Sequence, residues 1–164
     1  NNKVGNVIYK VIEYFGDDVR RINHFLKVYG YVKLIGECEN LDDSMQEILE
    51  VTAVLHDVGI KVAEQKYNSS AGHYQQLEGP PVAKKILDEL GYPDDFVERV
   101  MYLIAHHHTY TNIDGMDYQI LVEADFLVNA DEDRLSSDAI ENFKEKIFKT
   151  TTGIAVLENN YLNL

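Results

Sequence analysis

Several side chains that can bind metals or transfer protons fall on the apolar faces of predicted helices. They are His24, His56, Asp57, His107 and Asp125. His24, for example, shares a helical face with Val28 and Ile35 and points with them toward the interior of the protein. Imidazole and carboxylate groups brought together from neighbouring helices can bind a divalent transition metal.

A buried polar cluster without a metal is the alternative interpretation of these residues. Ionised carboxylates are almost never fully buried unless they are paired or bound to a metal. Without a metal, Asp57 and Asp125 would therefore each need other partners. We expect one or two divalent ions, with Fe, Mn, Ni and Co as candidates and Mg also compatible.

The elements that must position these groups are predicted to be helices, because apolar residues recur every three or four positions between capping residues, glycines and prolines. The predicted helices span about residues 4–15, 18–35, 41–59, 80–90, 93–107, 117–128 and 136–147. Residues 60–79 are polar and are predicted to be a loop, with Pro80 and Pro81 in the first turn of the next helix. No alternating run indicates a strand, so the predicted fold class is all-α.

Length and composition are those of one soluble globular domain over residues 1–164. The net charge of −13 argues against binding of a nucleic-acid polymer, whose phosphates require a basic surface. No apolar stretch is long enough to span a bilayer, and no membrane partner is expected. The single cysteine, Cys38, cannot form an internal disulfide, which favours a cytoplasmic location. The sequence leaves the oligomeric state open.

Five motifs occur in an order and spacing that resemble the HD superfamily, a helical group rich in metal-dependent phosphohydrolases. They are Ile22–Val28 around His24, Val54-Leu55-His56-Asp57-Val58-Gly59, Glu78-Gly79-Pro80-Pro81-Val82-Ala83, Ile104-Ala105-His106-His107-His108 and Glu123-Ala124-Asp125-Phe126-Leu127. The resemblance covers residues 20–131. It implies a compact orthogonal bundle of about seven or eight helices, with helices from residues 136–164 packed on it.

The resemblance also implies a first metal site formed by four side chains. His24 and His56 would donate ring nitrogens, Asp125 would supply an oxygen, and Asp57 would reach toward a second ion.

A second metal site is implied by the paired histidines of members with two metals, which His107 and His108 match. Those members usually carry a histidine where this chain has Glu78. Glutamate can bind a metal through oxygen, so Glu78 is a candidate ligand. The other interpretation of Glu78 is an acidic residue that favours the start of a helix.

The implied reaction is hydrolysis of a phosphate ester of a small molecule, a nucleotide or a related phosphate, by a metal-activated hydroxide. Asp57 would orient the nucleophile, and His106 would protonate the leaving group. Lys27, Lys61 and Tyr74 are candidate contacts for the substrate.

Two other functions stay open. Some members with two metals use a di-iron centre to oxidise substrates with dioxygen, and iron content together with oxygen consumption would identify that activity. A non-catalytic metal- or ligand-binding module would keep the same ligands and release no phosphate.

Overall fold

The computed structural model describes residues 3–163, which contain nine α-helices, a short π-helix and no strand. This confirms the all-α prediction. The elements are α1 (Val4–Phe15), α2 (Val19–Cys38), α3 (Asp43–Leu55), α4 (Ile60–Tyr67), α5 (Gly72–Glu89), α6 (Asp94–His106), α7 (Met116–Glu132), α8 (Ser137–Lys146), α9 (Thr151–Leu157) and η1 (Glu158–Leu162).

Short polar side chains cap the first turns of four helices. Asp18, Asp42, Ser136 and Thr150 each accept a hydrogen bond from a backbone N–H three residues later, at 2.8–3.3 Å. These bonds satisfy N–H groups that have no partner inside a helix, and they fix where α2, α3, α8 and α9 begin.

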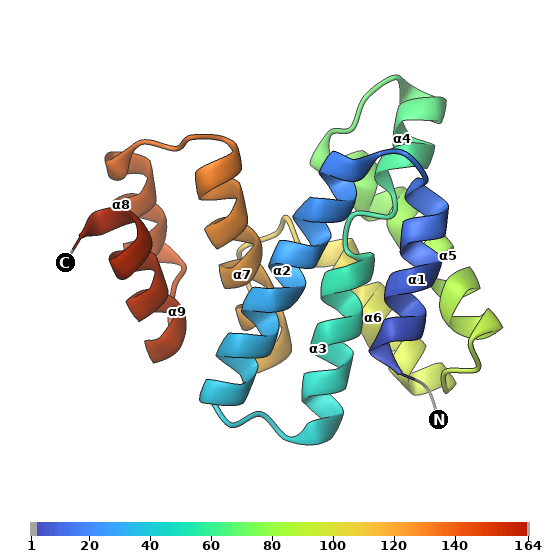
Figure 1. The fold of residues 1–164 in the computed structure, drawn as a ribbon, viewed down its shortest axis with the longest axis horizontal. Coiled ribbons are helices and arrows are strands. Elements are labelled where there is room, and N and C mark those ends of the chain that lie inside the picture. The colour runs from blue at the N-terminus through green and yellow to red at the C-terminus, as the bar shows by residue number, and fades with distance from the viewer. Residues whose placement is uncertain (1–2, 164) are drawn as a thin grey trace.

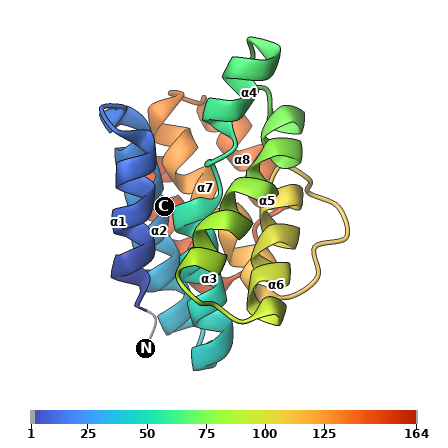
Figure 2. The same cartoon turned by 90° about the vertical axis from the view of Figure 1, so that its right-hand side faces the viewer.

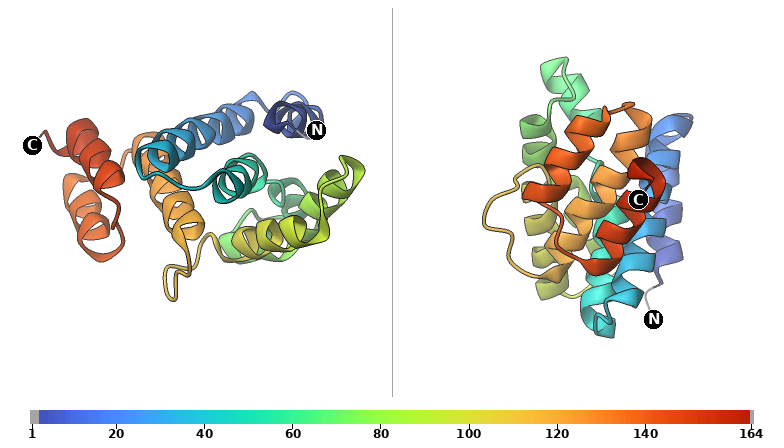
Figure 3. Two further views of the ribbon diagram at one scale, coloured as in Figure 1. Left: turned by 90° about the horizontal axis from the view of Figure 1, so that it is seen from below. Right: turned by 90° about the vertical axis from the view of Figure 1, so that its left-hand side faces the viewer.

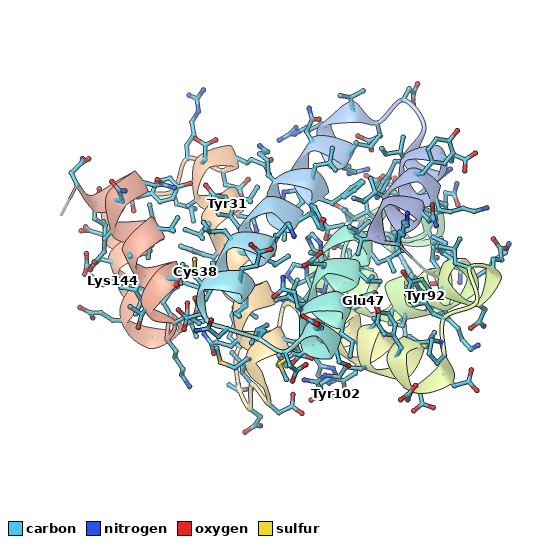
Figure 4. The ribbon with its side chains drawn as sticks, turned by 60° about the horizontal axis from the view of Figure 1, so that its bottom comes forward. Tyr31, Cys38, Glu47, Tyr92, Tyr102 and Lys144 are labelled. Carbon is cyan, nitrogen blue, oxygen red and sulfur yellow. The ribbon has the colours of Figure 1, made fainter. Side chains whose placement is uncertain are left out.

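The middle of the molecule is formed by α2, α3 and α7, with α1, α5 and α6 on one side and α8 and α9 at the opposite end (Figure 1). Seen from below, α8 and α9 form a pair beyond α7, far from the N-terminus (Figure 3). Lys144 on α8 and Tyr92 just after α5 accordingly lie at opposite ends (Figure 4). The helix α4 projects at the top, and the connection from α6 to α7 forms a wide loop on one side (Figure 2). None of the described helices combines the length and the hydrophobicity needed to cross a membrane.

Two buried apolar clusters form the core, and both include side chains of α2, α3 and α6. Neighbouring residues of one helix often belong to different clusters, as Leu103 and Ile104 of α6 do. Each fully buried leucine or isoleucine contributes about 1.5–3 kcal/mol of hydrophobic free energy. The helices α2, α3 and α6, which position His24, His56 and His107, are therefore each packed into both clusters.

The predicted loop over residues 60–79 is wrong, because the structure has α4 and the first half of α5 there. Only residues 68–71 connect them, and Asn68 ends α4 in a left-handed conformation with φ of 54°. The prolines lie inside α5 and not in its first turn. The buried residues Gln75, Gly79 and Ala83 form a stripe that continues past the prolines on another face of the helix. The stabilisation from packing this stripe outweighs the cost of the backbone hydrogen bonds that the prolines cannot donate.

Candidate metal centre

The candidate ligands come from four helices and meet at the ends of two of them. His24 lies within α2 and Asp125 within α7. His56 directly follows the last residue of α3, and His107 directly follows that of α6. The C-terminus of a helix carries a partial negative charge, so both helix ends favour a cation at this place.

The first group of ligand atoms is closely spaced. The Nε2 atoms of His24 and His56 are 3.3 Å apart, and Asp57 Oδ2 lies 3.2 Å from each of them. Asp125 Oδ1 lies 3.2 Å from the His24 nitrogen and 3.3 Å from the His56 nitrogen. Ligands about 2.0–2.2 Å from one ion are separated from their neighbours by about 3.0–3.4 Å. His24, His56 and Asp57 therefore fit the ligand shell of one divalent ion, and Asp125 lies beside both histidine nitrogens.

Asp57 faces two groups with its two carboxylate oxygens. While Oδ2 faces His24 and His56, Oδ1 lies 3.6 Å from Nε2 of His107. Asp57, His107 and His108 form a second set whose ligand atoms all lie within 4.8 Å of one another. A carboxylate in this position can bridge two ions.

Each of three imidazoles uses its other ring nitrogen as an anchor. His56 Nδ1 lies 2.6 Å from the carbonyl oxygen of Ala53, and His107 Nδ1 lies 2.6 Å from that of Ile104. A carbonyl only accepts, so both rings donate from Nδ1 and leave a lone pair on Nε2 for a metal. His24 Nδ1 is 2.7 Å from a carboxylate oxygen of Glu132, which acts in the same way.

The charges of the first group are balanced by protons when no metal is bound. Burial by itself lowers the pKa of His24, but hydrogen bonds with Asp125 and Asp57 outweigh it and raise the pKa to about 10. The pKa of His56 is also raised, because the charge of Asp57 and the nearby carboxylates outweigh the effect of burial. Burial raises the pKa of both carboxyls, yet the imidazoles hold each below its usual range. A metal would displace these protons.

The second group contains polar atoms that lack partners. The Nε2 atoms of His107 and His108 are buried and make no hydrogen bond among the described residues. Burial, followed by the neighbouring His107, lowers the pKa of His108 to about 4, so this ring is neutral at physiological pH. Each unpaired buried group costs about 1–3 kcal/mol, and a bound cation would satisfy both nitrogens.

A close backbone contact sets the distance between the His56-Asp57 turn and α5. A Cβ atom on Gly59 would lie 2.6 Å from the backbone nitrogen of Gly79 and 2.7 Å from the backbone oxygen of Gln75. Real Cβ atoms do not approach backbone atoms so closely. Gly59 is therefore required because α5 passes directly over the turn that carries the ligands.

A cavity of about 670 Å³ opens beside the candidate ligands. Its lining includes His24, Asp57, His108 and Asp125, together with acidic side chains and two arginines at the start of α2. These arginines are Arg20 and Arg21, and Arg21 is paired with Asp18 and Glu64. The cavity therefore combines candidate metal ligands with guanidinium groups in one lining.

Glu78 and His106 lie outside both ligand groups. The Glu78 carboxylate is 3.0 Å from Lys66 Nζ and accepts a hydrogen bond of 2.8 Å from the Tyr67 hydroxyl. His106 stacks on Tyr102, its Nδ1 is 2.8 Å from the Tyr102 carbonyl oxygen, and it does not line the cavity. The structure supports neither metal binding by Glu78 nor proton donation by His106.

The three predicted substrate contacts also lie away from the cavity lining. Lys61 donates a hydrogen bond of 3.3 Å to the backbone oxygen of Tyr14, and its Nζ lies over the aromatic ring of the same residue. Lys27 is paired at 2.7 Å with Glu132, which does line the cavity. Tyr74 stacks on Tyr67 with ring centroids 4.0 Å apart.

Sequence reasoning missed two functional candidates that the structure brings to the cavity, Gln75 and Glu132, whereas Arg20 and Arg21 already precede His24 by about one turn as possible contacts for a substrate anion. Glu132 lies seven residues after Asp125, two turns along the same helical face, and this spacing could have revealed it. The sequence does not indicate Gln75, because the polar composition of its segment predicts a loop, which has no inward face.

Comparison with known proteins agrees with this fold. The family model described as HD domain matches residues 21–141. A solved structure, a predicted HD superfamily hydrolase from an uncultured Thermotogales bacterium, is 23% identical and superimposes with a TM-score of 0.66 over 98% of this chain and 84% of that one. At this identity the likeness establishes the HD fold. No curated protein matches the chain.

Proposed function

Because the chain belongs to the HD domain family, we propose that it is a metal-dependent phosphohydrolase that acts on a phosphate ester of a small molecule, such as a nucleotide. The observation that carries the proposal is the position of Asp57, with one oxygen toward His24 and His56 and the other toward His107. Such an arrangement suits two ions that act together on one phosphate.

The proposed roles follow from the contacts. His24, His56 and Asp125 hold the first ion, and Asp57 reaches both ions. His107 and His108 supply nitrogen ligands to the second. When bound, divalent ions supply Lewis acidity toward the phosphoryl group and generate a nucleophile from water at neutral pH.

The cavity supports a small anionic substrate. Its volume of about 670 Å³ lies within the range of about 300–1,000 Å³ that is usual for small-molecule sites. The protein carries a net charge of −13, so an incoming phosphate needs local positive charge. Arg20 lines the cavity without an acidic partner within 4 Å and is proposed to contact the phosphate.

The test combines metal analysis with phosphate release. Metal-free protein is loaded separately with Mn, Fe, Co, Ni or Mg and assayed on p-nitrophenyl phosphate and a panel of nucleoside monophosphates. The variant Asp125→Asn removes a charged ligand, whereas Asp131→Asn changes an exposed residue of the same helix. We expect Asp125→Asn to lose more activity than the 10–100-fold typical of residues that only support a ligand, and Asp131→Asn to keep it.

Two outcomes would contradict the proposal. Full activity of Asp125→Asn would separate the reaction from this site. Oxygen consumption by the iron-loaded protein, with no phosphate released from any ester, would favour the oxygenase interpretation.

A further inference from the structure

Gln75 carries a buried amide oxygen that has no partner. The residue is 8% exposed and lies on the inner stripe of α5. Its Nε2 donates to the backbone oxygen of Ser70 at 2.6 Å, which fixes the orientation of the amide. The Oε1 atom on the other side of that amide is buried and makes no hydrogen bond.

This oxygen belongs to the same corner of the molecule as the second ligand group. Gln75 lines the cavity together with Asp57 and His108. The N-terminal part of α5 contacts His108 directly, because Gln76 Oε1 accepts a hydrogen bond of 3.0 Å from the His108 backbone N–H. A Cβ atom on Gly72 would lie 3.0 Å from the His108 ring.

Unpaired buried atoms are concentrated here. Within residues 3–163, five buried side-chain nitrogen or oxygen atoms lack a hydrogen-bond partner, and three of them are Oε1 of Gln75 and the Nε2 atoms of His107 and His108. His107 Nε2 carries a lone pair, since its Nδ1 donates to a carbonyl. An amide oxygen and this lone pair both accept, so neither can satisfy the other. A cation can satisfy both.

We propose that Gln75 Oε1 completes the second metal site, together with Asp57, His107 and His108. The proposal rests on the proposed function and names a ligand of that same centre. It assigns to Gln75 the ligand position that the sequence suggested for Glu78. The Glu78 carboxylate, on the same helix, is already bound by Lys66 and Tyr67.

The neutral amide has consequences for the strength and selectivity of the site. The first ion has two carboxylates, Asp57 and Asp125, whereas the second has only the shared Asp57. The second ion therefore binds more weakly. Amide oxygens suit Mn²⁺ better than imidazole does, while imidazole suits Zn²⁺.

The test is a calorimetric titration of metal-free protein with Mn²⁺ and with Zn²⁺, with bound metal counted by elemental analysis. We expect the wild type to bind two Mn²⁺ in unequal steps. Gln75→Leu, of similar size but without a ligand atom, should weaken the second step by at least the roughly tenfold typical of lost supporting residues, and leave the first unchanged. Gln75→Glu should keep two Mn²⁺, and Gln75→His should shift the second step toward Zn²⁺.

Two controls separate the amide oxygen from nearby alternatives. Gln46 also has an unpaired buried Oε1, but it contacts Val32 and Glu50 and lies outside the cavity. Gln46→Leu should leave both binding steps unchanged, and so should Glu78→Gln. Circular dichroism melting checks that each variant is folded.

The proposal is overturned if Gln75→Leu binds two Mn²⁺ as tightly as the wild type does, or if Glu78→Gln alone loses the second ion. A wild type that binds one ion and still releases phosphate would overturn this inference and leave the proposed function standing. A wild type that binds none would remove both.

Discussion

At the scale of single residues, the three anchored histidines differ in what supports them. His56 and His107 each donate a hydrogen bond to a backbone carbonyl, which no side-chain substitution can remove. His24 is hydrogen-bonded to the carboxylate of Glu132. Lys27 also forms an ion pair with this carboxylate, at 2.7 Å. A charged acceptor makes the opposite nitrogen a stronger ligand. Of the three acceptors that hold these rings, Glu132 is the one side chain. Mutation of Glu132 can therefore change the strength of a metal–nitrogen bond at His24.

The raised pKa of His24 predicts how the stability of metal-free protein depends on pH. Its folded pKa of about 10 exceeds the unfolded value of about 6.5, so its contribution is complete below pH 6.5 and is lost as pH rises toward 10. Asp57 and Asp125 have lowered pKa values and stay ionised across this range. Protein treated with a chelator should therefore lose stability between pH 6.5 and 9.

Scanning calorimetry across this pH range gives the measurement, and metal-loaded protein is the control. A metal replaces the protons of the first group, so the loaded protein should show a much smaller pH dependence over the same interval. Equal slopes for the two forms would show that the imidazoles and carboxylates are not coupled as the structure has them.

Residue types and spacing were enough to find the side chains that converge, because ionisable residues fall on the inward faces of several predicted helices at once. His24, His56, Asp57 and Asp125 do meet within 3.2–3.3 Å contacts. Glu78 differs from these residues, because the sequence indicates it only through its place in a motif. Which residue of that segment points inward depends on the phase of α5.

At the scale of elements, the contact between the turn after α3 and α5 leads to a matched pair of substitutions. Gly59→Ala places a Cβ against backbone atoms of Gly79 and Gln75 that cannot move aside singly. We expect a loss of about 1–3 kcal/mol in the free energy of unfolding, as for overpacked cores. Urea unfolding of chelator-treated protein measures it without a contribution from metal binding.

Gly30→Ala is the control for the intrinsic effect of the added methyl group. Gly30 lies in the middle of α2 with nothing within 4 Å of the added atom. Alanine there should raise the free energy of unfolding by about 0.5–1 kcal/mol. If both variants change stability in the same direction, the close approach does not determine the spacing.

Helices with a clear apolar stripe and a capping residue were predictable, and α2 and α8 are examples. The helix α4 and the first half of α5 were not predictable, because the local sequence signals conflict there. Polar composition and two prolines indicate a loop, while the stripe from Gln75 through Gly79 to Ala83 is visible only if the prolines are allowed inside a helix. The free energy of burying this stripe against neighbouring helices favours the helix over a loop. That free energy depends on tertiary contacts, which a single sequence does not show.

At the scale of the whole molecule, a buried carboxylate joins the C-terminal helices to the rest. Glu123 of α7 is fully buried and accepts hydrogen bonds from Gln119, from the backbone N–H groups of Lys149 and Thr150, and from the Thr150 hydroxyl. Glu123→Ala leaves these donors without an acceptor. We expect a loss on the order of 3 kcal/mol in the free energy of unfolding, measured by urea denaturation of metal-loaded protein.

Glu39→Ala is the milder counterpart, since Glu39 accepts two hydrogen bonds from Thr152 of α9 in a partly buried position. It should cost about 1 kcal/mol. Because Glu123 and Asp125 are two residues apart on one helix, they face nearly opposite sides, and both variants should keep their metal. If the two variants lose equal free energy of unfolding, Glu123 is not the main contact that attaches the C-terminal helices to the rest of the protein.

The pairing of Gly59 with Gly79 also limits how the gene can diverge. Where two side chains meet, a larger residue on one side can be offset by a smaller one on the other, and lineages can pass through such exchanges. Here the opposing atoms are backbone, and both partners already have the smallest residue. No second mutation can compensate for a Cβ at position 59. Among close relatives, position 59 should stay glycine while position 30 drifts freely.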